Sequence, residues 1–157
     1  MFYNIDLRQA TVADLPEIQI VFVETIRQVA NSDYNPAQIE AWAAGVRNQK
    51  RWEDAIDDQY FLVATAEDAI VGFGSLDEGG YLDFLYVHKD YQRKGIAHTL
   101  YEQLEQEAIS KNCVQITTNA SKTARLFFLA QGFEVVKENS NQIRGVEVVN
   151  YRMQKVL

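Results

Sequence analysis

Cysteine, histidine and proline are scarce in this chain, which argues against an internal disulfide, a metal site and helices broken by proline. The single cysteine, Cys113, has no partner for a disulfide, and beside an apolar strand pattern it is expected to be a small buried side chain. Two histidines and one cysteine provide no ligand spacing for a metal ion, so no metal site is expected. Pro16 and Pro36 both stand where a helix is expected to begin, where proline is tolerated.

Long apolar runs are also missing. No stretch approaches the roughly 20 residues that a helix needs to span a bilayer. The first residues lack the charged and apolar regions of a signal peptide. We therefore expect a cytoplasmic protein with no membrane partner.

Positive charge is in deficit. The 15 lysines and arginines face 22 acidic residues, and the net charge is -7. Nonspecific nucleic-acid binding needs clustered basic side chains against phosphate, so no nucleic-acid partner is expected. This balance does not exclude a local basic pocket, and Gln92-Arg93-Lys94 is one of the few basic clusters.

The composition is that of one ordinary globular domain. The chain has 157 residues, of which 47% are hydrophobic and 24% charged. Such values belong to a folded chain that can bury a substantial core. No linker, repeat or low-complexity stretch divides the sequence, so residues 1–157 are expected to form a single domain.

Hydrophobic periodicity predicts a strand and two helices in the first third. Residues 5–8 alternate as a strand, and apolar residues spaced by three and four follow over residues 15–29. Asn35 before Pro36 has the form of a helix cap followed by a first-turn proline. A short third piece is expected to carry Trp52 before the period changes.

Three strands in succession are expected next, over residues 60–64, 69–74 and 81–87. The short turn at Glu67-Asp68 and a glycine pair join them, which favours an antiparallel meander.

A helix near residues 96–108 then leads to a strand at 114–118, and a connection through a helix implies a parallel neighbour. A short helix around residues 124–128 and two closing strands, near 133–136 and 146–153, complete the chain. The fold class is therefore α/β, a single domain with a mixed sheet in the order β-α-α-β-β-β-α-β-α-β-β.

The turn between the third strand of the meander and the following helix indicates a phosphate site. Residues 84–87 are apolar, residues 88–94 are polar, and a helix pattern starts at Gly95. A strand, a glycine-bearing turn and a helix start direct free backbone N–H groups and the positive end of the helix dipole at one spot. The sequence therefore predicts a phosphorylated ligand here.

This element order, together with the motif in the turn, resembles the GNAT superfamily of acyl-CoA N-acyltransferases. Residues 92–97 read Gln-Arg-Lys-Gly-Ile-Ala, which matches the signature Gln/Arg-x-x-Gly-x-Gly/Ala between the fourth strand and the third helix. Residues 124–133 resemble the segment that ends in Gly-Phe, and residues 7–15 resemble the first strand and helix. The resemblance covers nearly the whole chain and implies a GNAT-like fold.

The resemblance implies acetyl-CoA, or coenzyme A, as the cofactor. Amides of the turn would cradle the pyrophosphate, with Gly95 allowing close backbone approach. The preceding strand would pair with the pantetheine arm opposite the strand that reaches Asn119. Ser121 lies where many members have an asparagine that touches the cofactor, but it can also cap a helix. The residues assigned to the cofactor are Leu85, Tyr86, Val87, Gln92, Arg93, Lys94, Gly95, Ile96, Ala97, Asn119, Ser121, Arg125 and Phe128.

The family reaction is direct attack of an amine on the acetyl thioester, and a base must take a proton from that amine. By the two-residue period, Tyr81, Asp83 and Leu85 share one strand face. Asp83 is the only carboxylate among them and is the candidate base, but an aspartate that forms a salt bridge or binds the substrate ammonium is an equal alternative. Tyr81 is a candidate catalytic or substrate contact, or a water anchor.

Phe128 departs from the pattern of the family. Many members place a tyrosine there, which protonates the leaving thiolate, and phenylalanine cannot donate a proton. A free thiol has a reference pKa of about 8.5, so a thiolate is a tolerable leaving group at neutral pH. The departure keeps open a second hypothesis, a non-catalytic module that binds or senses acyl-CoA. Arg125 can reach a cofactor phosphate or stand exposed.

The acceptor is expected to be an amine of a small molecule or of a protein. Its site should lie under the first two helices and their connection, with the loop before the last strand. Tyr34 and Trp42 are candidates to line it, with a purely structural role as the alternative for both. The acidic balance mildly favours a cationic acceptor. The sequence leaves a homodimer open.

Overall fold

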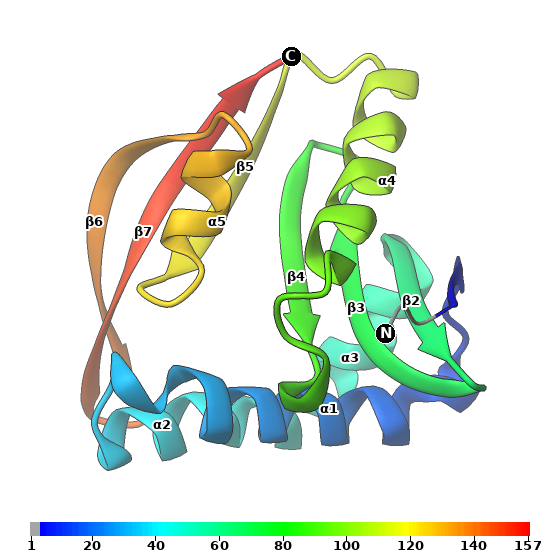
Figure 1. Cartoon of the computed structure of the whole chain (residues 1–157). Coiled ribbons are helices and arrows are strands. Elements are labelled where there is room, and N and C mark those ends of the chain that lie inside the picture. Colours follow the sequence, from blue (N-terminus) through cyan, green and yellow to red (C-terminus); the bar gives the residue numbers. More distant parts are fainter. Residues whose placement is uncertain (1–3) are drawn as a thin grey trace.

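A seven-stranded mixed sheet, in the order β1-β2-β3-β4-β5-β7-β6, forms the centre of the molecule (Figure 1). The computed structural model describes residues 4–157, so residues 1–3 of the expected domain lie outside the described part. The elements are β1 (Ile5–Gln9), α1 (Leu15–Val29), α2 (Pro36–Ala43), α3 (Gln49–Asp58), β2 (Tyr60–Ala66), β3 (Ala69–Leu76), β4 (Tyr81–Val87), α4 (Ile96–Ser110), β5 (Gln115–Ser121), α5 (Arg125–Ala130), β6 (Glu134–Ile143) and β7 (Val146–Val156).

The predicted α/β class and mixed sheet are confirmed, with one added helix. The expected short third piece is α3, a helix of ten residues that begins after Asn48. The Asn48 side chain accepts a hydrogen bond from the N–H of Arg51, and Trp52 and Ala55 are the buried face. Three helices therefore precede β2. Of the residues described, no helix is long and apolar enough to cross a membrane.

Local signals placed the turns and caps correctly. Glu67 and Asp68 both have positive φ, 51° and 66°, as a two-residue hairpin turn between β2 and β3 requires. Asn35 caps α2 by accepting a hydrogen bond from the N–H of Gln38 at 2.9 Å. Cys113 differs from expectation, because it is half-buried rather than fully buried.

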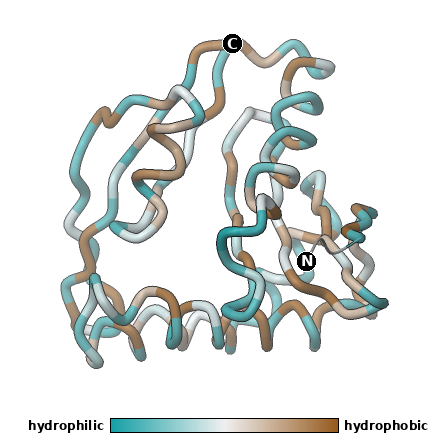
Figure 2. The backbone as a smooth tube through the Cα atoms, viewed as in Figure 1, coloured by the Kyte–Doolittle hydropathy of each residue, from teal (hydrophilic) through white to brown (hydrophobic). Residues whose placement is uncertain are grey.

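Two apolar clusters lie on opposite faces of the sheet. Side chains of α1, α2 and α3 pack with Phe61, Phe73 and Phe84 on one face. Side chains of α4 and α5 pack with Leu62, Leu82 and other strand residues on the second face. The loop between β4 and α4 stands out as a hydrophilic segment (Figure 2).

A β-bulge interrupts β4 at Asp83. Ser75 of β3 pairs with Phe84 and Leu76 pairs with Leu82, which leaves Asp83 as an extra residue without a partner on β3. A bulge of this kind breaks the two-residue alternation of side chains. The predicted common face of Tyr81, Asp83 and Leu85 is therefore wrong for Leu85, which packs with the α4 cluster.

The sheet divides between β4 and β5. The two strands are parallel and pair only at Tyr81–Thr117 and Leu82–Thr118. The hydroxyl of Thr118 donates a 2.9 Å hydrogen bond to the carbonyl of Leu82, and both residues are buried. Beyond this point β4 and β5 diverge toward α1 and α2 (Figure 1). The later residues of β4 therefore have no strand partner on the β5 side.

Candidate active site

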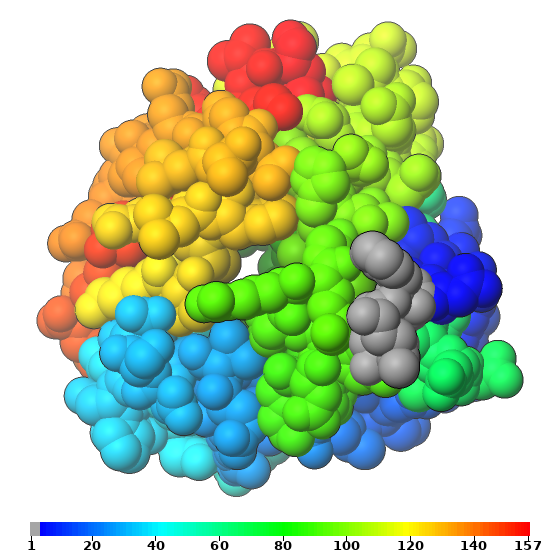
Figure 3. Space-filling view, in the orientation of Figure 1, coloured from blue at the N-terminus to red at the C-terminus, as the bar shows by residue number. Residues whose placement is uncertain are grey.

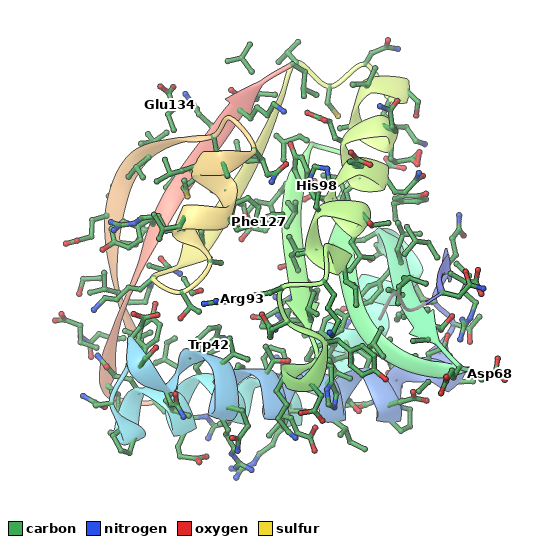
Figure 4. The ribbon with its side chains drawn as sticks, viewed as in Figure 1. Trp42, Asp68, Arg93, His98, Phe127 and Glu134 are labelled. Atoms are coloured by element: carbon green, nitrogen blue, oxygen red, sulfur yellow. The ribbon has the colours of Figure 1, made fainter. Side chains whose placement is uncertain are left out.

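A cavity of about 280 Å³ occupies the divergence of the two strands, and we call it the β4–β5 cavity. A hollow opens there between the α5 region and the β4–α4 region (Figure 3). Arg93, Trp42 and Phe127 lie around the opening (Figure 4). Strand and helix side chains line it, among them Thr25, Leu85, Tyr86, Val87, Gln92, Ala97, Asn119, Ser121, Phe127 and Phe128.

The turn at the mouth of this cavity has the geometry of an anion site. Arg93 and Gly95 have positive φ, 59° and 80°, and Gly95 is the N-cap of α4. Apart from Gly95 and its two neighbours in the chain, no residue has an atom within 4 Å of the position where a Cβ on Gly95 would stand, so space is open beside it. The first amides of α4 lack intrahelical partners, as at every helix start. A pyrophosphate group fits this open, amide-lined turn.

The turn is fixed to the end of β4 through one carbonyl. The side-chain amide of Gln92 donates to the Val87 carbonyl at 2.6 Å, and the Thr25 hydroxyl of α1 donates to the same oxygen at 3.1 Å. Gln92 therefore holds the turn in place, and its side chain is already bonded.

Ser121, Arg125 and Phe128, which were predicted to contact the cofactor, lie in three different environments on and before α5. Ser121 ends β5, and its Oγ accepts a hydrogen bond from the N–H of Ala124, which is the residue at the cap position of α5. Phe128 is 3% exposed and also lines the β4–β5 cavity. Arg125 does not line that cavity, because its guanidinium lies over the ring of Tyr151 at 4.7 Å.

Tyr34 lies at the far wall with its hydroxyl fully engaged. The hydroxyl donates to the Val149 carbonyl at 2.7 Å and accepts from the N–H of Lys122 at 2.9 Å. Burial raises the pKa of Tyr34. The side chain thus joins the α1–α2 connection to β7 and to the segment before α5. These contacts correspond to the purely structural role that was the alternative to substrate binding.

Asp83 is bound on both carboxylate oxygens. The guanidinium of Arg51 donates to them at 2.9 and 3.0 Å, and the side-chain amide of Gln59 donates at 2.8 Å. The Asp83 side chain is 8% exposed and that of Arg51 is 47% exposed. The hydrogen bond from Arg51 to Asp83 raises the pKa of Arg51. Of the two roles left open for Asp83, the structure shows the salt bridge.

Tyr81 begins a chain of polar side chains that crosses the sheet. Its hydroxyl accepts from the amide of Asn119 at 3.1 Å. The amide of Asn139 contacts Asn119 Oδ1 at 3.2 Å and Asn150 Oδ1 at 2.9 Å. Burial raises the pKa of Tyr81, and the hydrogen bond from Asn119 offsets part of this rise. Tyr81 therefore keeps its proton at neutral pH.

A second cavity, of about 260 Å³, adjoins the first, and we call it the Arg51 cavity. Its polar wall contains Asn48, Arg51, Asp83 and Arg144, and its apolar wall contains Phe22, Trp42, Trp52, Phe84, Tyr86 and Ile143. Trp42, Asp83, Tyr86 and Ile143 line both cavities. The bulged part of β4 thus lies between two neighbouring spaces.

The fold and this strand-turn-helix geometry define an acyl-CoA N-acyltransferase of the GNAT type. The family described as "Acetyltransferase (GNAT) domain" matches residues 30–155, so the chain belongs to the GNAT acetyltransferase family. It is an N-acetyltransferase of that family, whose cofactor is acetyl-CoA.

Individual relatives agree with this assignment. The chain is 32% identical over 150 residues to the uncharacterized N-acetyltransferase YafP of Escherichia coli K12, covering 96% of this chain and 95% of YafP. A GCN5-related N-acetyltransferase structure from Rhodopseudomonas palustris superposes with a TM-score of 0.94 at 32% identity, covering 100% and 99% of the two chains. The PaiA N-acetyltransferase of Thermoplasma acidophilum, solved with coenzyme A, has the same fold with a TM-score of 0.81 at 22% identity, covering 98% and 99%.

Sequence reasoning missed three residues that line the Arg51 cavity. Arg51 comes from a helix that was expected only as a short piece, and its partner Asp83 is 32 residues away in the chain. Ile143 and Arg144 lie at the β6–β7 turn, which is the loop before the last strand that was expected at the acceptor site without any residue named. The Arg144-Gly145 pair, with φ of 50° and 80°, is the one local signal that could have located this turn.

Proposed function

We propose that the protein transfers the acetyl group of acetyl-CoA to the primary amine of a small molecule held in the Arg51 cavity. The observation that carries this proposal is the shared wall of Trp42, Asp83, Tyr86 and Ile143 between the two cavities. One space follows the unpaired edge of β4 and ends at the amide-lined turn. The Arg51 cavity is lined by side chains of α1, α2, α3, β4 and the β6–β7 turn. Its volume favours a small acceptor over a protein segment.

The donor side of the reaction rests on main-chain groups. Acetyl-CoA supplies an acetyl group already activated as a thioester. The amides from Arg93 to Ala97 would hold its pyrophosphate, supported by Gln92. Leu85, Tyr86 and Val87, opposite Asn119, present the unpaired strand edge to its pantetheine arm. Lys94 and Ile96 belong to the same turn and helix start.

The bulge at Asp83 supports the role of β4 at the reacting carbonyl. An extra residue leaves the ladder locally unpaired, so the backbone of Asp83 has no partner residue on β3. Donors that are fixed before the reaction stabilise developing negative charge on a carbonyl oxygen without reorganisation. We infer that this part of β4 polarises the carbonyl that the amine attacks.

We infer that Asp83 and Tyr81 each act through a neighbouring residue rather than on the amine itself. Asp83 is committed to Arg51 and Gln59, so we infer that it positions Arg51 at the wall of the Arg51 cavity. Tyr81 accepts one hydrogen bond from Asn119 and lines neither cavity, so we infer that it positions Asn119 at the wall of the β4–β5 cavity. A water that passes the proton of the amine to solvent is compatible with both roles.

The test is a thiol-release assay with acetyl-CoA and a panel of small primary amines. We expect release of coenzyme A that depends on the amine, with N-acetylated product identified by mass spectrometry. Trp42→Ala, which removes a wall shared by both cavities, should raise KM for the amine by about tenfold or more. Absence of acetylated product across the panel, with acetyl-CoA bound, would contradict the proposed function.

A further inference from the structure

The charges on the wall of the Arg51 cavity reverse the sign of the whole molecule. The chain carries a net charge of -7. The wall of this cavity contains two guanidinium groups, those of Arg51 and Arg144, and one carboxylate, that of Asp83. The local sum is therefore positive, in contrast to the cationic acceptor that the overall acidity favours.

The one carboxylate of the cavity is poorly placed to attract a cation. Both oxygens of Asp83 accept hydrogen bonds from Arg51, one also accepts from Gln59, and the side chain is 8% exposed. Its charge is balanced by a guanidinium 2.9 Å away. An ammonium group entering the cavity would meet a neutral pair rather than a free anion.

The guanidinium groups remain available to an anion. Arg51 uses two of its N–H groups on Asp83 and is 47% exposed. Arg144 is exposed at the β6–β7 turn and forms no ion pair with any residue from 4 to 157. Guanidinium groups recognise carboxylate and phosphate with directed, charge-assisted hydrogen bonds.

We propose that the acceptor is a small amine that also carries an anionic group, of the amino-carboxylate class, with an apolar body. This proposal rests on the proposed function. The anionic group lies toward Arg144 and the free side of Arg51, and the amine lies toward the wall that the two cavities share. The apolar body faces Trp42 and Ile143, which line the same space.

Binding of N-acetylated products tests this class without requiring turnover. The probes are two matched pairs, N-acetylphenylalanine with N-acetylphenethylamine, and 4-(acetamidomethyl)benzoate with N-benzylacetamide. Each is titrated by calorimetry into the protein saturated with coenzyme A. In at least one pair we expect the carboxylated compound to bind about tenfold or more tightly, the gain typical of a charge-assisted hydrogen bond.

Two variants locate the source of this preference. Arg144→Gln should remove most of the preference for the carboxylated compound. Arg47→Gln removes one positive charge beside α2 at a residue that lines neither cavity, and it should leave the preference intact. Equal affinity within both pairs, no binding of any probe, or a preference that survives Arg144→Gln would overturn the proposed class.

Acetyl transfer to the parent amines is measured in parallel, which separates the two proposals. A carboxylate preference in binding without any turnover would contradict the proposed function and support the anionic subsite. Turnover of phenethylamine and benzylamine at least as efficient as that of their carboxylated partners would support the function and overturn the acceptor class.

Discussion

At the scale of single residues, the contacts of Asp83 bear most directly on the mechanism. A general base needs a free lone pair within reach of the proton that it takes. The hydrogen bonds from Arg51 and Gln59 occupy this carboxylate. The ion pair in turn holds the guanidinium of Arg51 over the ring of Phe84, 4.7 Å from its centroid. We therefore propose that the carboxylate acts on the reaction through Arg51.

Asp83→Asn is expected to lower kcat/KM by about tenfold, because Arg51 loses the partner that positions it. Arg51→Gln should give a similar loss, and the double variant should lose no more than either single variant. Affinity for coenzyme A, measured by calorimetry, should stay unchanged and serves as the control. The shape of the pH profile should be retained in Asp83→Asn. Loss of a titrating limb in that variant alone would instead identify Asp83 as the base.

At the scale of elements, a bulge in β4 and a side-chain contact before α1 determine how neighbouring elements lie against each other. The bulge in β4 turns Asp83 toward α3 and leaves Leu85 with the α4 cluster.

Before α1, the carboxylate of Asp14 accepts two 2.8 Å hydrogen bonds from the guanidinium of Arg8 and one from the N–H of Thr11. This clamp joins β1 to the helix that covers the sheet.

The Asp14 clamp makes part of the stability depend on pH. The hydrogen bond from Arg8 is the largest cause that lowers the pKa of Asp14, from 3.8 to about 2. A carboxyl with a lowered folded pKa stabilises the protein above its unfolded value, and this stability is lost as the pH falls toward 2. Because Arg8 is half exposed, we expect a contribution of about 1 kcal/mol.

Urea unfolding measures this contribution by comparison with Asp14→Asn. The free energy of unfolding of the unmodified protein should exceed that of the variant at pH 6, and the difference should shrink as the pH is lowered from about 4 toward 2. Asp6→Asn, a matched change on β1 at an aspartate with no ion pair among the described residues, is the control. A difference that is constant over this range would show that the clamp does not titrate.

At the scale of the whole molecule, two parts of the sheet meet at only two residue pairs between β4 and β5. A ligand that binds in the β4–β5 cavity contacts both parts, and binding only to the folded state stabilises it by mass action. Coenzyme A at about 100 times its Kd should add about 2.7 kcal/mol, which raises Tm by about 5 to 10 °C. Thermal unfolding with and without coenzyme A measures this shift.

Substitutions at Gly95 identify the turn as the source of the shift. Gly95→Glu places a carboxylate in open space beside the amides, so it should abolish the shift through repulsion of phosphate. Gly95→Asn is the matched control, because asparagine tolerates a φ of 80° and adds no charge. It should retain most of the shift. An equal shift in Gly95→Glu would contradict the cofactor assignment.

Local patterns predicted much of the fold and the donor half of the site, but little of the acceptor half. The Glu67-Asp68 turn, the Asn35 cap and the turn before α4 depend on neighbouring residues, so the sequence reveals them. The bulge at Asp83 arises from pairing with β3, and no residue type near it signals the extra position. The Arg51 cavity joins α2, α3, β4 and a distant turn, which only the folded chain brings together.

The divergence of β4 from β5 also bears on aggregation through unpaired strand edges. Unpaired backbone groups at an exposed sheet edge invite pairing with strands of other chains, which leads to aggregation. Here the unpaired stretch of β4 lies inside the molecule, facing α5 and β5 across the β4–β5 cavity (Figure 1). A strand of another chain carries side chains on both faces and would have to enter between these elements with them. A slender extended ligand needs less room. The unpaired edge of β4 is thus available to a ligand and is faced by other elements of the same chain.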